Sequence, residues 1–152
     1  MSNPSNTLLE TEETIRSVIE ILIDSQEGFQ TIGAELKDAA LKRYFEAESL
    51  RRAEFRGELE SLLHQEGVRD VKEGGTVAGA VHRTWGDLKA KLGGGDHSLL
   101  VTAEQGEDEA KRVYSKALEK DLPLPIRQII STQFEQIRTS HDYVKAARDC
   151  SE

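Results

Sequence analysis

The sequence predicts an all-α protein whose four long helices pack as a bundle. Charged residues make up 32% of its 152 residues, aromatic residues only 5%, and three are prolines, a composition typical of long solvated helices. Four stretches repeat apolar residues every three or four positions, which is the spacing of a buried helix face. A chain of this length fits one domain that buries about two-thirds of its unfolded surface.

The first helix is predicted to begin at Thr11, with residues 1–10 as a disordered N-terminal tail. The Thr11 hydroxyl can cap the helix, and Glu12 and Glu13 suit the positive end of its dipole. Its apolar stripe consists of Ile15, Val18, Ile19, Leu22, Phe29, Ile32 and Leu36, with Gln26 where an apolar residue is expected.

A turn at Lys37-Asp38 precedes the second helix, predicted from about Ala39 to Glu66 with Asp38 as its cap and Gly67 as its stop. Its stripe passes through two charged residues, Glu48 and Arg52. The apolar members of this stripe are Leu41, Phe45, Phe55, Leu59 and Leu62.

A crossover of about residues 67–95 follows, and a connection of this length is expected to contain structure of its own. It can run the full height of a bundle, which would make the second and third helices parallel. A short extra helix is predicted in it from the spacing of Val77, Val81, Trp85, Leu88 and Leu92.

The third helix is predicted to start with Asp96 as its cap, and the prolines of Leu122-Pro123-Leu124-Pro125 separate it from the fourth. Glu107 lies one heptad after Leu100 and one before Tyr114, so it is expected to point inward. The bundle is predicted to span residues 11–149. The apolar stripes are Leu99, Leu100, Ala103, Ala110, Val113, Tyr114 and Ala117, then Ile126, Ile130, Ile137, Val144 and Ala147.

Each stripe carries polar residues near the middle of its helix, and counting from the turns brings them to a similar height. One interpretation is a metal site, because carboxylates and imidazole suit iron, manganese or zinc. Buried metals between carboxylates and histidines are a feature of ferritin-like bundles. The candidate ligands are Glu48, Glu104, Glu107 and His141, and the polar layer as a whole is Gln26, Glu48, Arg52, Glu107, Gln133 and His141.

The other interpretation of this layer is a buried ion-pair network without a metal. Arg52 follows Glu48 by one turn and brings a permanent cation, which suits bidentate pairing with Glu48 or Glu107. The Glu-x-x-His spacing that supplies metal ligands in such bundles is absent from all four helices, and only His141 offers an imidazole to the layer.

Other polar features carry weaker expectations. His64 suits the end of the second helix, and His82 and His97 are expected at the surface or in packing. Glycines inside helices cost up to about 1 kcal/mol each. They are expected to permit close helix approach beside Phe29, Phe55 and Tyr114, and they are Gly28, Gly33, Gly57 and Gly106.

Composition also excludes several classes of function. The formal charge of -8 argues against a nucleic-acid partner, and no basic amphipathic face suits a membrane surface. No apolar run approaches the roughly 20 residues that cross a bilayer, and the N-terminus lacks the features of a signal peptide. The single cysteine, Cys150, fits a reducing cytoplasm.

Over nearly its whole length the chain resembles a bacterial family of ferritin-like four-helix-bundle proteins of unknown function. The resemblance implies a ferritin-like fold and self-association, and it implies no established activity. It depends on Asp24, Gly28-Phe29, Arg52, Phe55, Glu58-Leu59, His82-Arg83-Thr84-Trp85, Leu88-Lys89, Glu104-Gln105-Gly106-Glu107-Asp108, Leu122-Pro123, Gln133, Ile137 and His141-Asp142.

The sequence therefore favours a cytoplasmic, non-catalytic structural or interaction protein, stress-related by analogy, without a cofactor and most simply a homodimer. The alternative is a metal-binding protein or di-metal oxidoreductase that uses the carboxylates at mid-bundle and His141, with iron, manganese or zinc as its cofactor.

Overall fold

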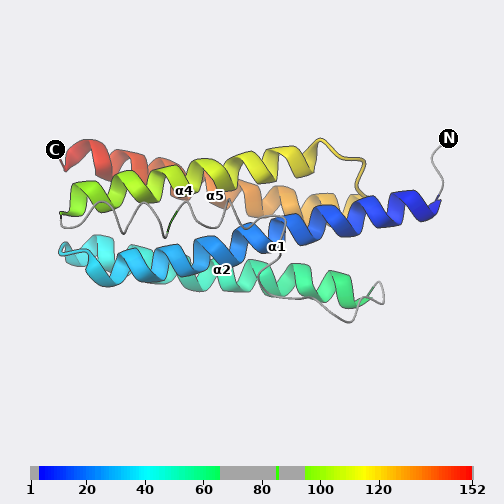
Figure 1. The fold of residues 1–152 in the computed structure, drawn as a ribbon, viewed down its shortest axis with the longest axis horizontal. Coiled ribbons are helices and arrows are strands. Elements are labelled where there is room, and N and C mark those ends of the chain that lie inside the picture. The colour runs from blue at the N-terminus through cyan, green and yellow to red at the C-terminus, as the bar shows by residue number, and fades with distance from the viewer. Residues whose placement is uncertain (1–3, 66–84, 86–94, 152) are drawn as a thin grey trace.

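In the part of the chain that the structure describes, four long helices lie side by side (Figure 1). This computed structural model describes residues 4–65, 85 and 95–151. The helices are α1 (Pro4–Glu35), α2 (Ala39–Gln65), α4 (Asp96–Leu118) and α5 (Leu124–Cys150). The prediction of an all-α protein with four helices is therefore confirmed, while the predicted helix inside the crossover lies outside the described residues.

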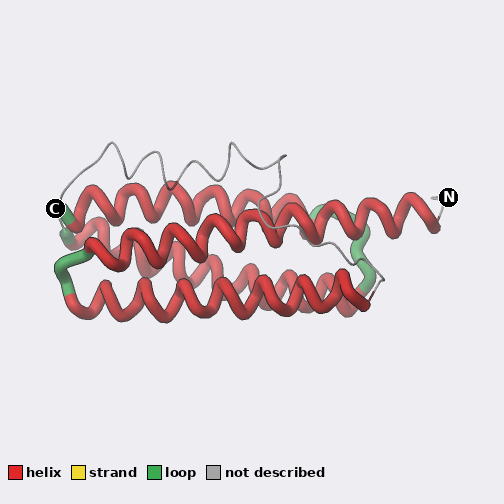
Figure 2. Tube along the Cα trace, turned by 60° about the horizontal axis from the view of Figure 1, so that its bottom comes forward, coloured by secondary structure: helices red, strands yellow, loops and turns green. Residues whose placement is uncertain are grey.

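The helices α2 and α4 begin at the same end of the molecule and run in the same direction (Figures 1 and 2). The Asp96 carboxylate at the start of α4 links the two beginnings. It accepts hydrogen bonds from the backbone N–H groups of Lys37 (2.8 Å) and Asp38 (3.0 Å), in the turn between α1 and α2. The expectation that Asp96 caps its own helix was wrong, because its carboxylate serves this neighbouring turn and Gly95 occupies the cap position.

Helix boundaries match the sequence pattern at α2 and differ from it at α1. Asp38 caps α2 by accepting a 2.9 Å hydrogen bond from the Leu41 N–H, as expected. By contrast α1 begins at Pro4, not at Thr11, so the predicted disordered tail is helical from Pro4 onward. Proline suits the first turn of a helix, where its missing N–H would have no partner anyway, and this signal competes with the cap at Thr11.

The apolar core is divided into two clusters along the bundle. One lies toward the α4–α5 connection and includes Leu22, Leu59 and Ile130, while the other lies toward the α1–α2 turn and includes Phe45 and Val144. Between them, each helix contributes buried polar side chains. They are Asp24 and Ser25 on α1, Glu48, Ser49 and Arg52 on α2, Glu107 on α4, and Gln133, Ser140 and His141 on α5.

Trp85, from the crossover, is buried against α1 and α4 where both helices carry a glycine. A β-carbon at Gly28 would lie 2.2 Å from the indole, and one at Gly106 would lie 2.0 Å from it. These two glycines make room for Trp85, so the expectation that they serve helix contacts beside Phe29 and Tyr114 was wrong. Gly33 does fit the expectation of close helix approach, because its β-carbon would lie 2.9 Å from that of Phe45 on α2.

No helix in the described part of the chain is both long and apolar enough to cross a membrane.

Candidate functional site

The middle of the bundle is held by an arginine between two glutamates. Arg52 donates two parallel hydrogen bonds to Glu107, Nη1 to Oε1 at 2.8 Å and Nη2 to Oε2 at 2.9 Å. Its Nε donates to Glu48 Oε2 at 2.9 Å, one turn earlier on the same helix. All three side chains are almost wholly removed from solvent. The two carboxylates thus share one cation in a geometry that satisfies the guanidinium on both edges.

Neighbouring groups stabilise the positive charge of Arg52. The Arg52 guanidinium lies over the ring of Phe29, 4.8 Å from its centroid, in a cation–π contact. Burial by itself would lower the pKa of Arg52, but the charges and hydrogen bonds of Glu107 and Glu48 outweigh it and raise the pKa above its usual range. Arg52 is therefore permanently charged in the folded protein.

Amides from α5 complete the network. Gln136 donates from Nε2 to the second oxygen of Glu48 at 3.1 Å. Gln133 accepts a 2.7 Å hydrogen bond from the buried Tyr114 hydroxyl and donates to the Phe55 carbonyl and the Glu58 carboxylate, each at 3.2 Å. The hydrogen bonds that these amides donate join α5 to α2, the helix that carries Arg52.

A dinuclear metal centre does not fit this layer. Such a centre needs the oxygens of the inward-facing carboxylates as bridging and terminal ligands. Here Glu107 uses both oxygens on Arg52, and Glu48 uses its two on Arg52 and Gln136. A metal at mid-bundle would also lie against a guanidinium whose charge repels it.

The part of α1 in the layer differs from the prediction. Gln26 is only partly buried, and the contact that the structure gives it is through its backbone carbonyl, which accepts a 3.0 Å hydrogen bond from the Ser49 hydroxyl. Near mid-bundle, the buried polar residues of α1 are instead Asp24 and Ser25. Burial, together with repulsion from Glu27, raises the pKa of Asp24 to about 8. The predicted polar position on α1 was thus wrong by one to two residues, because counting residues from the turn does not fix the rotation of the helix.

His141 lies apart from the arginine, in a second cluster where α4 meets α5. Its Nε2 is 2.8 Å from Asp108 Oδ1, and its Nδ1 is 3.1 Å from Asp142 Oδ1. The hydrogen bond from the ring lowers the pKa of Asp142. Glu104 joins the cluster one turn before Asp108 and also contacts Arg148. The four metal-ligand candidates thus divide into two pairs, Glu48 with Glu107 and Glu104 with His141.

Residues that the sequence pattern passed over take part in both places. Asp108 follows the inward-facing Glu107 in the chain and contacts His141 on α5, and Gln136 contacts Glu48; neither was among the predicted residues of the polar layer. Of the other histidines, His64 is exposed in the last turn of α2, as expected. His97 contacts the Ser151 hydroxyl through Nδ1 at 3.0 Å, and His82 lies outside the described residues.

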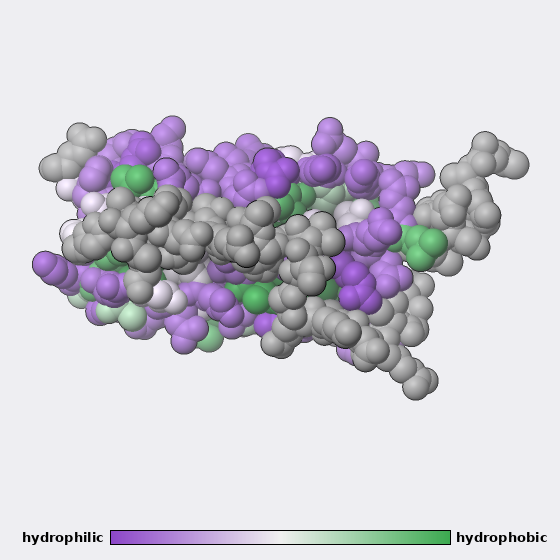
Figure 3. Space-filling model, in the orientation of Figure 1, coloured by the Kyte–Doolittle hydropathy of each residue, from purple (hydrophilic) through white to green (hydrophobic). Residues whose placement is uncertain are grey.

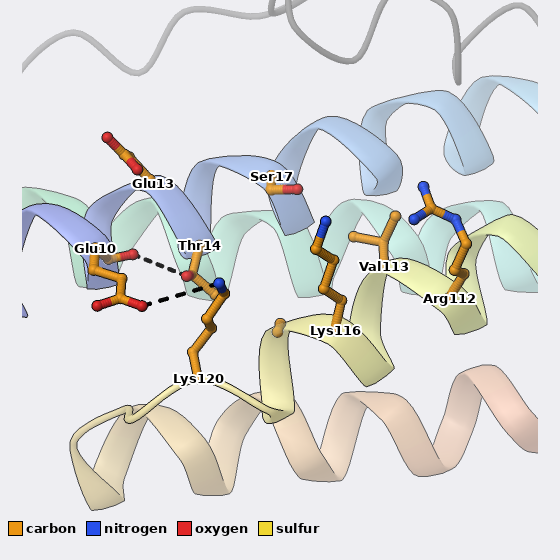
Figure 4. A pocket seen from close by; sticks show the side chains of 9 residues that line it. Glu10, Glu13, Thr14, Ser17, Arg112, Val113, Lys116 and Lys120 are labelled. Atoms are coloured by element: carbon orange, nitrogen blue, oxygen red, sulfur yellow. Dashed lines mark hydrogen bonds and ion pairs between the residues drawn. The ribbon is translucent and has the colours of Figure 1, made fainter.

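An open groove of about 230 Å³ runs between α1 and α4 near the N-terminus (Figure 4). Glu10 and Glu13 line it from α1, with Lys116 and Lys120 from α4. The Lys120 ammonium lies 4.0 Å from the Glu10 carboxylate across the groove. Opposite charges face each other here, so the groove does not select a ligand of either sign.

Fold and layer together define the protein as a four-helix bundle with a buried arginine–carboxylate centre. The family model that matches the chain is described as a domain of unknown function (DUF2383), and it covers residues 10–120. The match extends from α1 through α4 and spans most of the chain, and the chain belongs to this family. A comparison with curated proteins found no significant match.

Proposed function

We propose that the protein is a ferritin-like bundle that has exchanged its metal centre for an ion-pair layer and that acts as a non-catalytic structural or interaction protein. The observation that carries the proposal is the position of Arg52, whose guanidinium takes up both oxygens of Glu107 and one of Glu48. Supporting the ferritin-like assignment, α2 and α4 are parallel (Figure 1), and residues 66–95 separate them in the sequence.

A protein without a reactive centre acts through its surface, and self-association is the simplest such action. On the face shown in Figure 3, the coloured residues are mainly hydrophilic, with scattered apolar ones. Large exposed apolar side chains include Leu50 on α2 and Leu124 on α5. We take a homodimer as the default, because twofold dimers are the commonest oligomers. A cytoplasmic location and a role in stress belong to the same proposal, the first supported by a lone free cysteine, Cys150.

Two measurements test the proposal. Light scattering of the purified protein should give twice the 16.9 kDa chain mass, and a monomer at micromolar concentration would remove the association. Aerobic oxidation of iron(II) should proceed at the rate of buffer alone. Oxidation that is accelerated by the wild type, retained in His141→Gln and lost in Glu107→Gln would show an active metal at mid-bundle and contradict the proposal.

A further inference from the structure

The second cluster, where α4 meets α5, has the composition and geometry of a mononuclear metal site. Glu104 and Asp108 are one turn apart on α4, and His141 faces them from α5. One ligand atom from each lies within 4.8 Å of the other two, and in the described part of the chain no other set of three acidic, histidine or cysteine side chains does so. We infer that Glu104, Asp108 and His141 bind a divalent first-row transition metal such as Zn²⁺, independently of the proposed function.

The histidine is oriented as a metal ligand. A carboxylate can only accept a hydrogen bond, so Nε2 of His141 donates to Asp108 at 2.8 Å and Nδ1 donates to Asp142 at 3.1 Å. A metal bound at Nε2 would take the place of the hydrogen there, while Nδ1 keeps its contact with Asp142. This contact fixes the ring with Nε2 directed at Asp108. An outer carboxylate that holds the second ring nitrogen is a recurrent support of metal-bound histidine. His141 is buried, which limits its choice of rotamers, whereas Asp108 is exposed and leaves a path for an ion.

The distances require only a small adjustment. Zinc bonds of about 2.0 Å in a tetrahedral arrangement place neighbouring ligand atoms about 3.3 Å apart. The Nε2 of His141 and Oδ1 of Asp108 are 2.8 Å apart, so the exposed Asp108 side chain needs to withdraw by about 0.5 Å. Imidazole with two carboxylates favours zinc, iron or manganese over magnesium, which prefers oxygen ligands alone.

One cation competes for this site. Arg148, near the end of α5, contacts Glu104 through Nη1 and Asp149 through Nη2. Lys111 and Arg138 also act on Asp142 through their charge. A bound metal therefore has to displace Arg148 from Glu104, and removing that arginine should strengthen binding. The arrangement differs from the mid-bundle layer, where Arg52 is enclosed and cannot move away.

The test is calorimetric titration of Zn²⁺ into the full chain without a tag. The wild type should bind one ion per chain. Asp108→Asn and Asp142→Asn should each weaken binding by about tenfold to a hundredfold, His141→Gln should abolish it, and Arg148→Gln should strengthen it. Glu135→Gln, an exposed carboxylate elsewhere on α5, is the control for net charge and should leave affinity within about twofold, since a distant exposed charge is screened.

The spectrum of bound Co²⁺ should report nitrogen ligation in the wild type and lose it in His141→Gln. Because Asp108 is exposed, Asp108→Asn keeps the fold even if a change at His141 does not, and circular dichroism checks this. Failure of the wild type to take up Zn²⁺ at millimolar concentration would overturn the inference. So would zinc binding that is equal in Asp108→Asn, in His141→Gln and in the wild type.

Discussion

Arg52 and Glu107 form a two-point ion pair, at 2.8 and 2.9 Å, in which neither side chain has any exposed surface. Two charges taken from water are costly unless each is fully paired. Here the pair is completed by Glu48 on the same helix and by Phe29 above the guanidinium. The pair joins α2 to α4, the two parallel helices, and so connects the two halves of the bundle at mid-height.

Replacing Arg52 by methionine should destabilise the protein by about 3–5 kcal/mol, because Glu48 and Glu107 would be left buried without their cation. Arg56→Met is the matched control on the same helix, where the ion pair with Glu60 is partly exposed and is expected to contribute less than about 1 kcal/mol. Urea unfolding followed by circular dichroism measures both. Equal losses in the two variants would show that Arg52 is not the centre of a buried network.

Adding a methyl group at Gly28 or Gly106 should displace Trp85, since the new β-carbon would lie 2.2 or 2.0 Å from the indole. Gly57→Ala is the control, because its β-carbon would meet no atom within 4 Å. That change should instead stabilise α2 by up to about 1 kcal/mol. Trp85 is the single tryptophan of the chain, so its fluorescence reports the displacement directly. Emission should shift to longer wavelength in Gly28→Ala and Gly106→Ala, and an unshifted spectrum in both would refute the packing of Trp85 between α1 and α4.

Removing the Tyr114 hydroxyl should cost about 1 kcal/mol, the usual effect of losing one buried hydrogen bond. In Tyr114→Phe the oxygen of Gln133 would lose its 2.7 Å donor. Tyr143→Phe, at an exposed tyrosine of α5, should change stability by less than about 0.5 kcal/mol. Thermal unfolding of the two variants compares them, and a Tyr114→Phe protein as stable as wild type would mean that Gln133 has another donor.

Asp24 should make stability decrease with rising pH. Its pKa is about 8 in the folded protein against 3.8 ordinarily, because of burial and repulsion from Glu27. The folded state therefore holds a proton that the unfolded chain releases. This stabilising contribution is complete below pH 3.8, declines as the pH rises, and is lost above about pH 8.

In Asp24→Asn this part of the decline should disappear, so melting temperatures of the variant should fall less between about pH 5 and pH 8 than those of the wild type. Asp121→Asn, at an exposed residue beyond α4, controls for the loss of a carboxylate. Parallel pH profiles for Asp24→Asn and wild type would argue that Asp24 is ionised in the folded protein.

Periodicity predicted most of the fold, because burial on a helix repeats at a fixed interval. The stripes of α1, α4 and α5 place their apolar residues in the core, and Asp38 and Pro123 bound helices where expected. The start of α1 was missed since proline at Pro4 and threonine at Thr11 are both acceptable helix starts. The hydrogen bonds of Asp96 to the α1–α2 turn could not be predicted from the residues around it, because tertiary contacts decide which backbone groups its carboxylate meets.

Most residues of the candidate site could be predicted from the sequence, but which of them lie together could not. Inward positions one turn apart identify Glu48 and Arg52 as neighbours, and a heptad count places Glu107 inside. Rotation of α5 by part of a turn decides whether His141 faces Arg52 or Asp108, and a sequence does not specify it. The role of Gly28 and Gly106 could not be predicted from the sequence, because both contact Trp85, which is distant from them in the chain.

The most direct test of the buried ion pair is a double-mutant cycle of Arg52→Met and Glu107→Leu, measured by urea unfolding. Arg52→Met leaves Glu107 and Glu48 buried without their cation, whereas Glu107→Leu removes the two-point pair and leaves Arg52 with Glu48 alone. If the guanidinium holds the layer together, Arg52→Met should cost less once Glu107 is absent. The double variant should then be more stable than the sum of the two losses predicts, by at least about 2 kcal/mol. Additive losses, within about 0.5 kcal/mol, would mean that Arg52 and Glu107 do not depend on each other and would contradict the account.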